Sequence, residues 1–336
     1  MNDARSLLVL LRSGAAAGVL RALLEKFGDA DAALAAGPVA WRESALADVA
    51  IAALERPDLA RVEADLEWLD LPAHHLIGWH DPDYPALLRT SVYPPAGLFV
   101  AGDPDLLWHP QVAIVGSRRP TAGGRENARQ FARAFGRAGF TVTSGLAEGI
   151  DAAAHLGAME ASRTIAVLGT GPDVCYPPGN APLLRDIVAN GAVVTEHPPG
   201  TPGKRQHFPS RNRLIAGLAL GTVVIEAAVR SGALITARMA ADAGREVFAL
   251  PGSIHNPMAR GCHRLIRQGV GLAETPAEVI ETLAPLAENL AAALRSRLTA
   301  AESPAVHLGG QPVRGAQERV IWQAIDHDPV NLDQLS

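Results

Sequence analysis

The chain has 336 residues, of which 48% are hydrophobic and 4% aromatic, and its formal net charge is −5 at pH 7. No apolar run is long enough to span a bilayer and the first residues show no signal-peptide pattern, which argues against a membrane or secreted protein. The two cysteines, Cys175 and Cys262, stand in no metal-binding spacing. We therefore expect a cytoplasmic protein that holds no metal ion and no cofactor.

Positive charge is concentrated in the middle of the chain. Residues 111–214 contain 12 Lys and Arg against 7 Asp and Glu, whereas residues 1–110 contain 8 against 16. A local basic patch on an acidic protein is typical of a protein that binds a polyanion. Four of these arginines recur at helical spacing, and a solvated helix face explains them equally well: Arg125, Arg129, Arg133 and Arg137.

Residues 1–70 predict a small domain of short helices. Apolar residues recur at helical spacing, and glycines such as Gly14 and Gly28 interrupt them. This helix–glycine–helix pattern loosely resembles a helix-hairpin-helix, which can grip a DNA backbone. Because the segment is acidic, we favour a helical bundle that serves packing or protein contact.

Residues 71–284 have the pattern of an α/β domain. Two short strands among proline-rich turns come first, and from Val112 onward short β-branched runs alternate with helical stretches. This alternation predicts βαβ units and hence an extended Rossmann-like fold, with a doubly wound, mainly parallel sheet. The runs are VAIVGS, FTVTSG, TIAVLG, GAVVTE, GTVVIE and REVFALPG.

The sequence pattern of the C-terminal part is less informative about structure. Residues 285–312 are rich in Ala, Pro and Gly, and we expect them to be part helix and part linker. Residues 313–336 begin another helical unit. Because so short a segment cannot build a core, we expect it to be the start of a small domain that has been truncated.

The candidate site lies in glycine-rich loops, because ligands of open α/β sheets bind beyond the carboxyl ends of the strands. The loop with Gly116, Ser117, Arg118 and Arg119 combines close backbone approach, amides at a helix start and fixed positive charge. These are the elements of a phosphate cradle. Neither GxGxxG nor GxxxxGK[ST] is present, which argues against a dinucleotide site and a P-loop.

Two further loops offer amides and hydroxyls, at Ser144–Gly145 and at Ser231–Gly232. A catalytic triad of Ser144, Asp151 and His155 is the enzymatic interpretation of the first of them. We disfavour it, because no GxSxG motif is present and residues four apart are neighbours in any helix. We expect Asp151 and His155 to orient loops by hydrogen bonds.

A basic Pro/Gly loop with Lys204 and Arg205 precedes Phe208. Cations there would bind phosphates and the ring would stack on a base, although Phe208 fits a plug of the core equally well. Arg211 and Arg213, on either side of Asn212, stand where a helix is expected to begin, a place that disfavours positive charge. Their candidate internal partners are Glu196 and Glu226. Because pairing both arginines would leave the basic surplus unexplained, we expect a phosphate at the helix start.

Nine motifs, taken in this order, resemble those of the DNA-processing protein A family, also called Smf. No single motif would suffice, but nine in register are highly specific, and they cover about residues 75–283. The motifs are DPDYPALL, LFVAGD, VAIVGSRRPT, SGLAEGIDAAAH, TIAVLGTG with YPPGN, HFPSRNRLIAG, EAAVRSGALITA, GREVFALPG and GCHRLIRQG.

The resemblance implies a protein that binds single-stranded DNA entering the cell in natural transformation, protects it and helps to load the RecA recombinase onto it. It also implies a homodimer formed by the Rossmann-like domain, and no catalytic activity. Residues 1–70 would then be a sterile-alpha-motif-like domain, and residues 313–336 the opening of a winged-helix-like domain.

The resemblance also assigns DNA contacts. The family's arginine after Gly-Ser corresponds to Arg118, its aromatic residue to Phe208, and the basic residue before that to Lys204 or Arg205. With the loop amides and hydroxyls and the RNR motif, the predicted DNA-binding residues are Gly116, Ser117, Arg118, Arg119, Ser144, Gly145, Lys204, Arg205, Phe208, Arg211, Asn212, Arg213, Ser231 and Gly232.

Two other classes of function stay open. Lysine-decarboxylase-like phosphoribohydrolases are the nearest enzymes by fold, but their PGGxGTxxE signature is only echoed here by Gly221, Thr222 and Glu226. A nucleotide-sensing module would bind a mononucleotide more tightly than an oligonucleotide. We favour sequence-independent binding of DNA phosphates in a basic groove. We predict that Arg118→Glu with Arg211→Glu abolishes DNA binding without unfolding the domain.

Overall fold

Alternate residues of the central strands point to opposite faces of one sheet, and both faces are apolar. In β3 (Gln111–Val115), Val112 and Ile114 pack into one core cluster, and Ala113 and Val115 pack into the other. Strands of this kind are stable only where helices cover both faces of the sheet. The computed structural model describes residues 2–302.

The sheet has nine strands in the order β1-β2-β6-β5-β4-β3-β7-β8-β9. Strand β2 pairs antiparallel with β1 and β6, and all other neighbours are parallel. The predicted doubly wound, mainly parallel sheet is therefore confirmed. Strand β9 was not expected, because two residues carry too little pattern. The other strands are β1 (His74–Gly78), β2 (Gly97–Gly102), β4 (Thr141–Ser144), β5 (Thr164–Val167), β6 (Ala192–Thr195), β7 (Gly221–Val224), β8 (Glu246–Ala249) and β9 (Gly271–Leu272).

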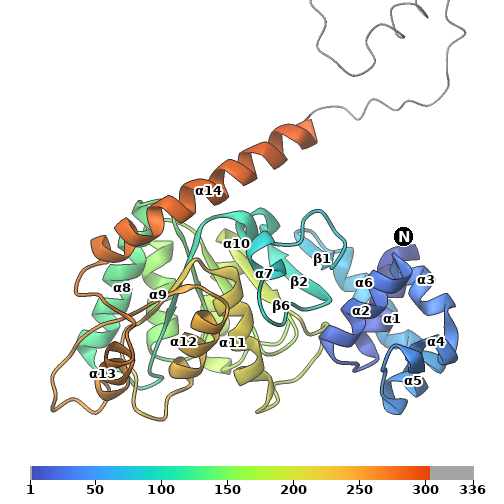
Figure 1. Cartoon of the computed structure of the whole chain (residues 1–336), viewed down its shortest axis with the longest axis horizontal. Helices are drawn as coiled ribbons and strands as arrows, with labels where there is room; N and C mark the ends of the chain where they lie inside the picture. Colours follow the sequence, from blue (N-terminus) through green and yellow to red (C-terminus); the bar gives the residue numbers. More distant parts are fainter. Residues whose placement is uncertain (1, 303–336) are drawn as a thin grey trace, which may run out of the picture. The chain divides into compact units, whose positions relative to one another are not determined.

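Helices cover both faces of the sheet (Figure 1). Side chains of α8, α9, α10 and the first turns of α14 pack on one face, and those of α11, α12 and α13 pack on the other. The bounds are α7 (Ala86–Arg89), α8 (Ala122–Arg137), α9 (Ile150–Met159), α10 (Ala181–Asn190), α11 (His207–Leu218), α12 (Gly232–Asp242), α13 (Arg260–Arg267) and α14 (Pro276–Glu302), with short 3-10 helices at η1 (Pro104–Trp108) and η2 (Pro178–Asn180).

The N-terminal segment forms six short helices around a leucine-rich core, as its apolar spacing predicts. This core continues into the β1–β2 hairpin: a Cβ on Gly78 would lie 2.9 Å from Leu7 Cδ2, and one on Gly97 would lie 3.0 Å from Leu11 Cδ1. The helical bundle and the sheet therefore share one continuous core. The helices are α1 (Asn2–Arg12), α2 (Ala17–Phe27), α3 (Ala30–Ala35), α4 (Gly37–Glu43), α5 (Asp48–Glu55) and α6 (Leu59–Leu69).

Helix α14 continues through Pro285 to Glu302, so the segment that was expected to be part helix and part linker starts as helix. The predicted winged-helix-like segment, residues 313–336, lies outside the described residues. Within residues 2–302, no helix is long and apolar enough to cross a membrane.

Candidate nucleic-acid interface

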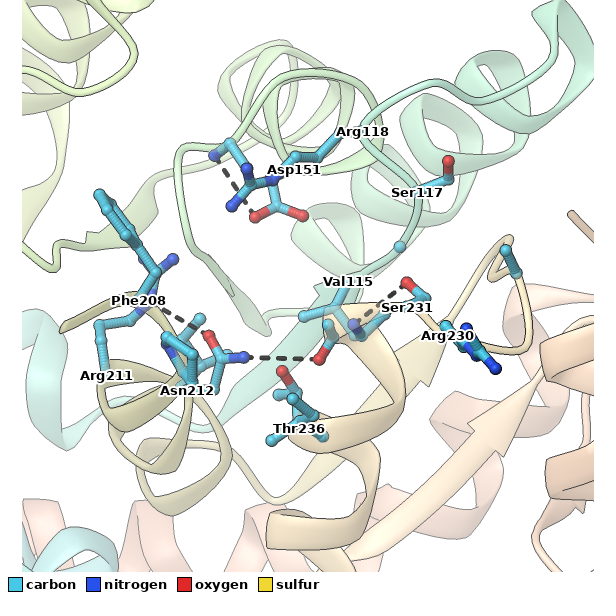
Figure 2. A pocket seen from close by; sticks show the side chains of 18 of the residues that line it. Val115, Ser117, Arg118, Asp151, Phe208, Arg211, Asn212, Arg230, Ser231 and Thr236 are labelled. Carbon is cyan, nitrogen blue, oxygen red and sulfur yellow. Dashed lines mark hydrogen bonds between the residues drawn. The ribbon is translucent and has the colours of Figure 1, made fainter. Parts of the chain in front are cut away.

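The strand order reverses at β3, whose parallel neighbours are β4 on one side and β7 on the other. The helices that follow these strands, α8 after β3 and α12 after β7, pack on opposite faces. The β3–α8 and β7–α12 loops therefore run to opposite faces of the sheet. Their separation opens a crevice at the carboxyl ends of the strands. A cavity of about 720 Å³, the strand-end cavity, lies there and is lined by the loops after β3, β4 and β7 and by the first turns of α11 (Figure 2).

The loops after β3 and β4 are locked against each other. The amide of Ile150 donates to the carbonyl of Ser117 at 3.1 Å. Gly149, which directly precedes Ile150, has φ 85°. A Cβ on Gly149 would lie 2.4 Å from the carbonyl oxygen of Ser117. Only glycine fits that position. Leu146, fully buried, also adopts a left-handed φ of 56°, a strained conformation that persists only where the surroundings over-determine it.

Four exposed arginines surround the strand-end cavity: Arg118, Arg119, Arg205 and Arg230. Within residues 2–302, none of them makes an ion pair. Arg230 is not among the predicted DNA-binding residues. Its place in the loop after β7, at the reversal of strand order, is the signal that identifies it. Four guanidinium groups around one cavity carry enough positive charge and enough donors for several phosphates rather than one.

Arg211 differs from these four because its side chain is buried. It donates to the carbonyl of Gly145 at 2.8 Å, at the end of β4, and also to the carbonyl of Val167 at the end of β5. Burial lowers the pKa of Arg211 to about 10, although the nearby Asp151 carboxylate opposes the shift. A Cβ on Gly145 would lie 2.7 Å from the guanidinium, so Gly145 makes room for it. Arg211 thus fastens α11 to the strand ends while it lines the cavity.

Arg213 is committed to internal partners. It pairs with Glu196, one of the two predicted acids, and donates to the carbonyl of Tyr93 at 2.5 Å. Of the cavities described in this subsection for residues 2–302, it lines none. Helix α11 begins at His207, so both arginines lie in its second turn rather than at its start. The unfavourable dipole position that suggested a phosphate there is therefore absent.

The geometry does not assemble a catalytic triad. Ser144 Oγ donates to the carbonyl of Ile114 at 2.6 Å, and His155 Nδ1 lies 2.8 Å from Thr164 Oγ1. Asp151 accepts a long hydrogen bond of 3.4 Å from the amide of Ala147. All three side chains hold backbone or core groups in place. The role predicted for Asp151, orienting a loop, agrees with this hydrogen bond.

Phe208 pairs with a second aromatic residue, Tyr176, with ring centroids 4.8 Å apart. Both rings line the strand-end cavity and a smaller adjoining one of about 90 Å³, which Arg118 and Gly145 also line. Phe208 is partly buried and Tyr176 is exposed. Tyr176 was missed in the sequence because its loop, after β5, reaches the site only through tertiary folding. A partly open aromatic pair beside arginines offers a stacking surface for a base.

Lys204 and Arg205 face different cavities. Arg205 lines the strand-end cavity. Lys204 lines a second cavity of about 660 Å³, the bundle-side cavity, between helices α1 and α6 and residues 197–207. Arg205 thus shares the strand-end cavity with Phe208, whereas Lys204 does not line it. The assignment of the DNA contact to one of these two residues stays a prediction.

The start of α12 forms the remaining wall of the strand-end cavity. Ser231 Oγ caps the helix by accepting from the amide of Ala233 at 3.3 Å. Asn212 lies between Arg211 and this helix start: its Oδ1 accepts from Arg211 Nε, and its Nδ2 donates to the carbonyl of Gly232 at 3.5 Å (Figure 2). Asn212 therefore ties α11 to α12 across the site.

Glu226 occupies the start of α8. Its carboxylate accepts from the amide of Thr121 at 2.8 Å, from Thr121 Oγ1 at 2.7 Å and from Asn256 Nδ2 at 3.2 Å. A Cβ on Gly124, in the first turn of α8, would lie 2.5 Å from this carboxylate. In nucleotide-binding folds the corresponding helix start holds a phosphate. Here an internal anion has taken that place.

Comparison with known proteins gives a consistent assignment. The family model of DNA recombination-mediator protein A matches residues 75–284. Protein Smf of Escherichia coli is 46% identical over 225 residues, which are 66% of this chain and 60% of that protein. The DNA processing protein of Streptococcus pneumoniae is 43% identical over 202 residues, 60% of this chain and 71% of that protein. The chain spans only about half the length of the Synechocystis Smf protein, 49%.

Solved structures agree with these relatives. DNA processing protein A from S. pneumoniae superposes with a TM-score of 0.71 at 34% identity, over 83% of this chain and 97% of that one. The Helicobacter pylori protein, whose structure concerns its single-stranded DNA binding mode, gives a TM-score of 0.56 at 28% identity, over 60% of this chain and 93% of that one. With the family model matched over most of the α/β domain, the chain belongs to the DNA recombination-mediator protein A family.

Proposed function

We propose that this chain binds single-stranded DNA by its backbone phosphates in the strand-end cavity, without catalytic activity. The observation that carries the proposal is the ring of four exposed arginines, Arg118, Arg119, Arg205 and Arg230, that make no ion pair within residues 2–302. The Phe208–Tyr176 pair adds a surface on which bases would stack. Phosphate contacts of this kind carry little sequence preference.

The proposed partners of the whole protein are single-stranded DNA, the RecA recombinase and a second copy of the chain. The family name supports a role as a DNA recombination mediator. Our proposal for the finer role is that the protein protects incoming single strands and loads RecA onto them in natural transformation. A homodimer would present two strand-end cavities to one strand and gain affinity from effective concentration. The two cysteines are both unpaired, which suits work in the cytoplasm.

A nucleotide hydrolase is the weaker alternative. Glu226, which the sequence places in an echo of the phosphoribohydrolase signature, is engaged by Thr121 and Asn256 at the start of α8. Its carboxylate would repel a nucleotide phosphate at that helix start. Ser144, Asp151 and His155 each hold structural groups and supply no nucleophile with an adjacent base.

The test is fluorescence anisotropy with a labelled dT oligonucleotide and the matching duplex, from low to high salt, on wild type and Arg118→Glu. We expect preference for the single strand, an affinity that falls steeply with salt, and at least about tenfold weaker binding by the variant. Equal and negligible binding by both proteins would overturn the proposal. Turnover of a nucleoside monophosphate by the wild type would then support the hydrolase.

A further inference from the structure

The segment between β6 and α11, the 196–206 loop, is held from two sides. On the sheet side, Asp173 accepts from the amide of Gly200 at 2.8 Å, and Thr201 accepts from the amide of Gly171 at 2.9 Å. On the other side, Arg12 of α1 donates to the carbonyl of Pro199 at 3.1 Å. The loop carries Arg205 into the strand-end cavity. Its two faces therefore serve a ligand site and an internal contact.

Arg12 is itself fixed by a buried carboxylate. Asp65 of α6 is fully buried and accepts from Nε and Nη2 of Arg12, in a bidentate pair. Burial raises the pKa of Asp65, and Arg12 opposes that shift. Such a two-point pair leaves the guanidinium one orientation, which aims its Nη2 at the Pro199 carbonyl. The position of the loop is thus set by the helical bundle through one side chain.

We infer that Arg12 is a positioning residue for single-stranded DNA binding, and that the N-terminal bundle acts on the DNA site through the 196–206 loop rather than by touching DNA. The inference rests on the proposed function. No residue of helices α1 to α6 lines the strand-end cavity. The loop contains three prolines and two glycines, and few hydrogen bonds join it to neighbouring segments. Loss of the Arg12 contact would therefore leave the loop held from the sheet side alone.

The test variant is Arg12→Met with Asp65→Leu, which replaces the buried pair by apolar side chains of similar size and leaves no unpaired charge. Its matched control is Arg5→Met with Glu63→Leu. Arg5 and Glu63 pair across the same two helices, α1 and α6, but both are exposed and neither lines the bundle-side cavity. Both variants are made in the full chain and compared with wild type. Hydrogen exchange measures the loop, and anisotropy with a labelled dT oligonucleotide measures DNA binding.

We expect the test variant to exchange the amides of Gly200 and Thr201, which donate to Asp173 and to the carbonyl of Pro198, about tenfold faster than wild type. It should also bind the oligonucleotide about tenfold more weakly. The control should match wild type in both measurements. Repeating the comparison in an Arg205→Ala background separates positioning from direct contact. If Arg12 acts through Arg205, the double substitution Arg12→Met with Asp65→Leu should weaken binding much less in the Arg205→Ala background than in the wild-type background.

Unchanged exchange in the loop would overturn the inference, and so would an affinity loss of equal size in the Arg205→Ala background. A wild-type chain that binds no oligonucleotide would overturn the proposed function instead. In that case the exchange rates still show whether Arg12 fixes the loop, so the two failures are distinguishable.

Discussion

Lys204 and Arg205 are consecutive in the chain, yet their side chains line different cavities. Arg205 lines the strand-end cavity together with Phe208, and Lys204 lines the bundle-side cavity together with residues of α1 and α6. Both are exposed cations of the same loop, so their net contribution to the long-range field is the same. A difference between them in DNA binding would therefore report direct contact rather than overall charge.

Charge reversal separates these two residues. We expect Arg205→Glu to weaken binding of a dT oligonucleotide by about tenfold or more, and to reduce the dependence of log affinity on log salt by about one phosphate contact. The loss of affinity in Lys204→Glu should be several-fold smaller than the loss in Arg205→Glu. The salt dependence of Lys204→Glu should stay close to that of wild type. Anisotropy titrations across a salt series measure both quantities, and equal losses in the two variants would contradict the assignment of Arg205 to the site.

Phe208 is expected to contribute by stacking. Phe208→Ala should reduce affinity for a dT oligonucleotide by about 1–3 kcal/mol, the range found for removal of an aromatic platform. The loss should be much smaller with an oligonucleotide that carries abasic sites, because phosphates remain and bases do not. A melting temperature within a few degrees of wild type is the control, since Phe208 also packs near Gly169 and Gly203. Equal losses with both oligonucleotides would show that the ring serves only as packing.

Arg211→Glu is expected to unfold the domain rather than to leave it intact, contrary to the sequence-based expectation. The substitution places a carboxylate among the carbonyls of Gly145 and Val167 and beside Asp151. A buried charge without a partner costs about 3–5 kcal/mol or more. Urea unfolding monitored by circular dichroism measures the change. Arg118→Glu, on an exposed residue, is the matched variant and should retain wild-type stability.

His155 makes the fold sensitive to acid. Thr164 Oγ1 donates to the carbonyl of Val142, so it accepts from His155 Nδ1. The buried Nε2 of His155 finds no hydrogen-bond partner among residues 2–302. Burial lowers the pKa of His155 to about 3, so the folded protein keeps the ring neutral. The unfolded chain binds a proton below about pH 6.5, and the free energy of unfolding therefore falls as the pH drops from 6.5 toward 3.

The expected size of this effect is on the order of 4 kcal/mol at the acid end. His155→Asn places an amide nitrogen where Nδ1 stood and removes the titrating group. The variant should lose less stability than wild type between pH 6.5 and 4, whatever its stability at neutral pH. Urea unfolding at a series of pH values measures the two slopes, and parallel curves would contradict the assignment to His155.

The doubly wound, mainly parallel sheet was predictable from the sequence because β-branched runs alternate with helical stretches, and most of these runs end in or lead to glycine. Parallel strands bring those ends to one edge, so the meeting of the Arg118 loop with the Ser231 loop follows from topology. The partner of Arg213 was also within reach, because Glu196 and Arg213 flank one connection. Arg211 was different. Residues two apart on a helix point to opposite sides, and only the path of α11 across the ends of β4 and β5 decides which one is buried.

Which cavity each of Lys204 and Arg205 lines could not be predicted from the sequence, for a related reason. A loop of prolines and glycines has no period from which the direction of a side chain could be inferred. Tyr176 lies in the loop after β5, and only the folded chain brings its ring beside that of Phe208. Sequence patterns thus located the loops, while tertiary contacts determined which side chains in them are free.

The carboxylate of Glu226 at the start of α8 has a consequence for competition inside a cell. A fold with a vacant helix start would attract the abundant free nucleotides, which would contend with DNA for the protein. Because Glu226 fills that position, a free nucleotide would find only the open arginines of the strand-end cavity, and a single small anion would gain little there. Under the proposed function a long strand would contact several of those arginines at once. We therefore expect the closed helix start to favour polymer over monomer as much as the open arginines do.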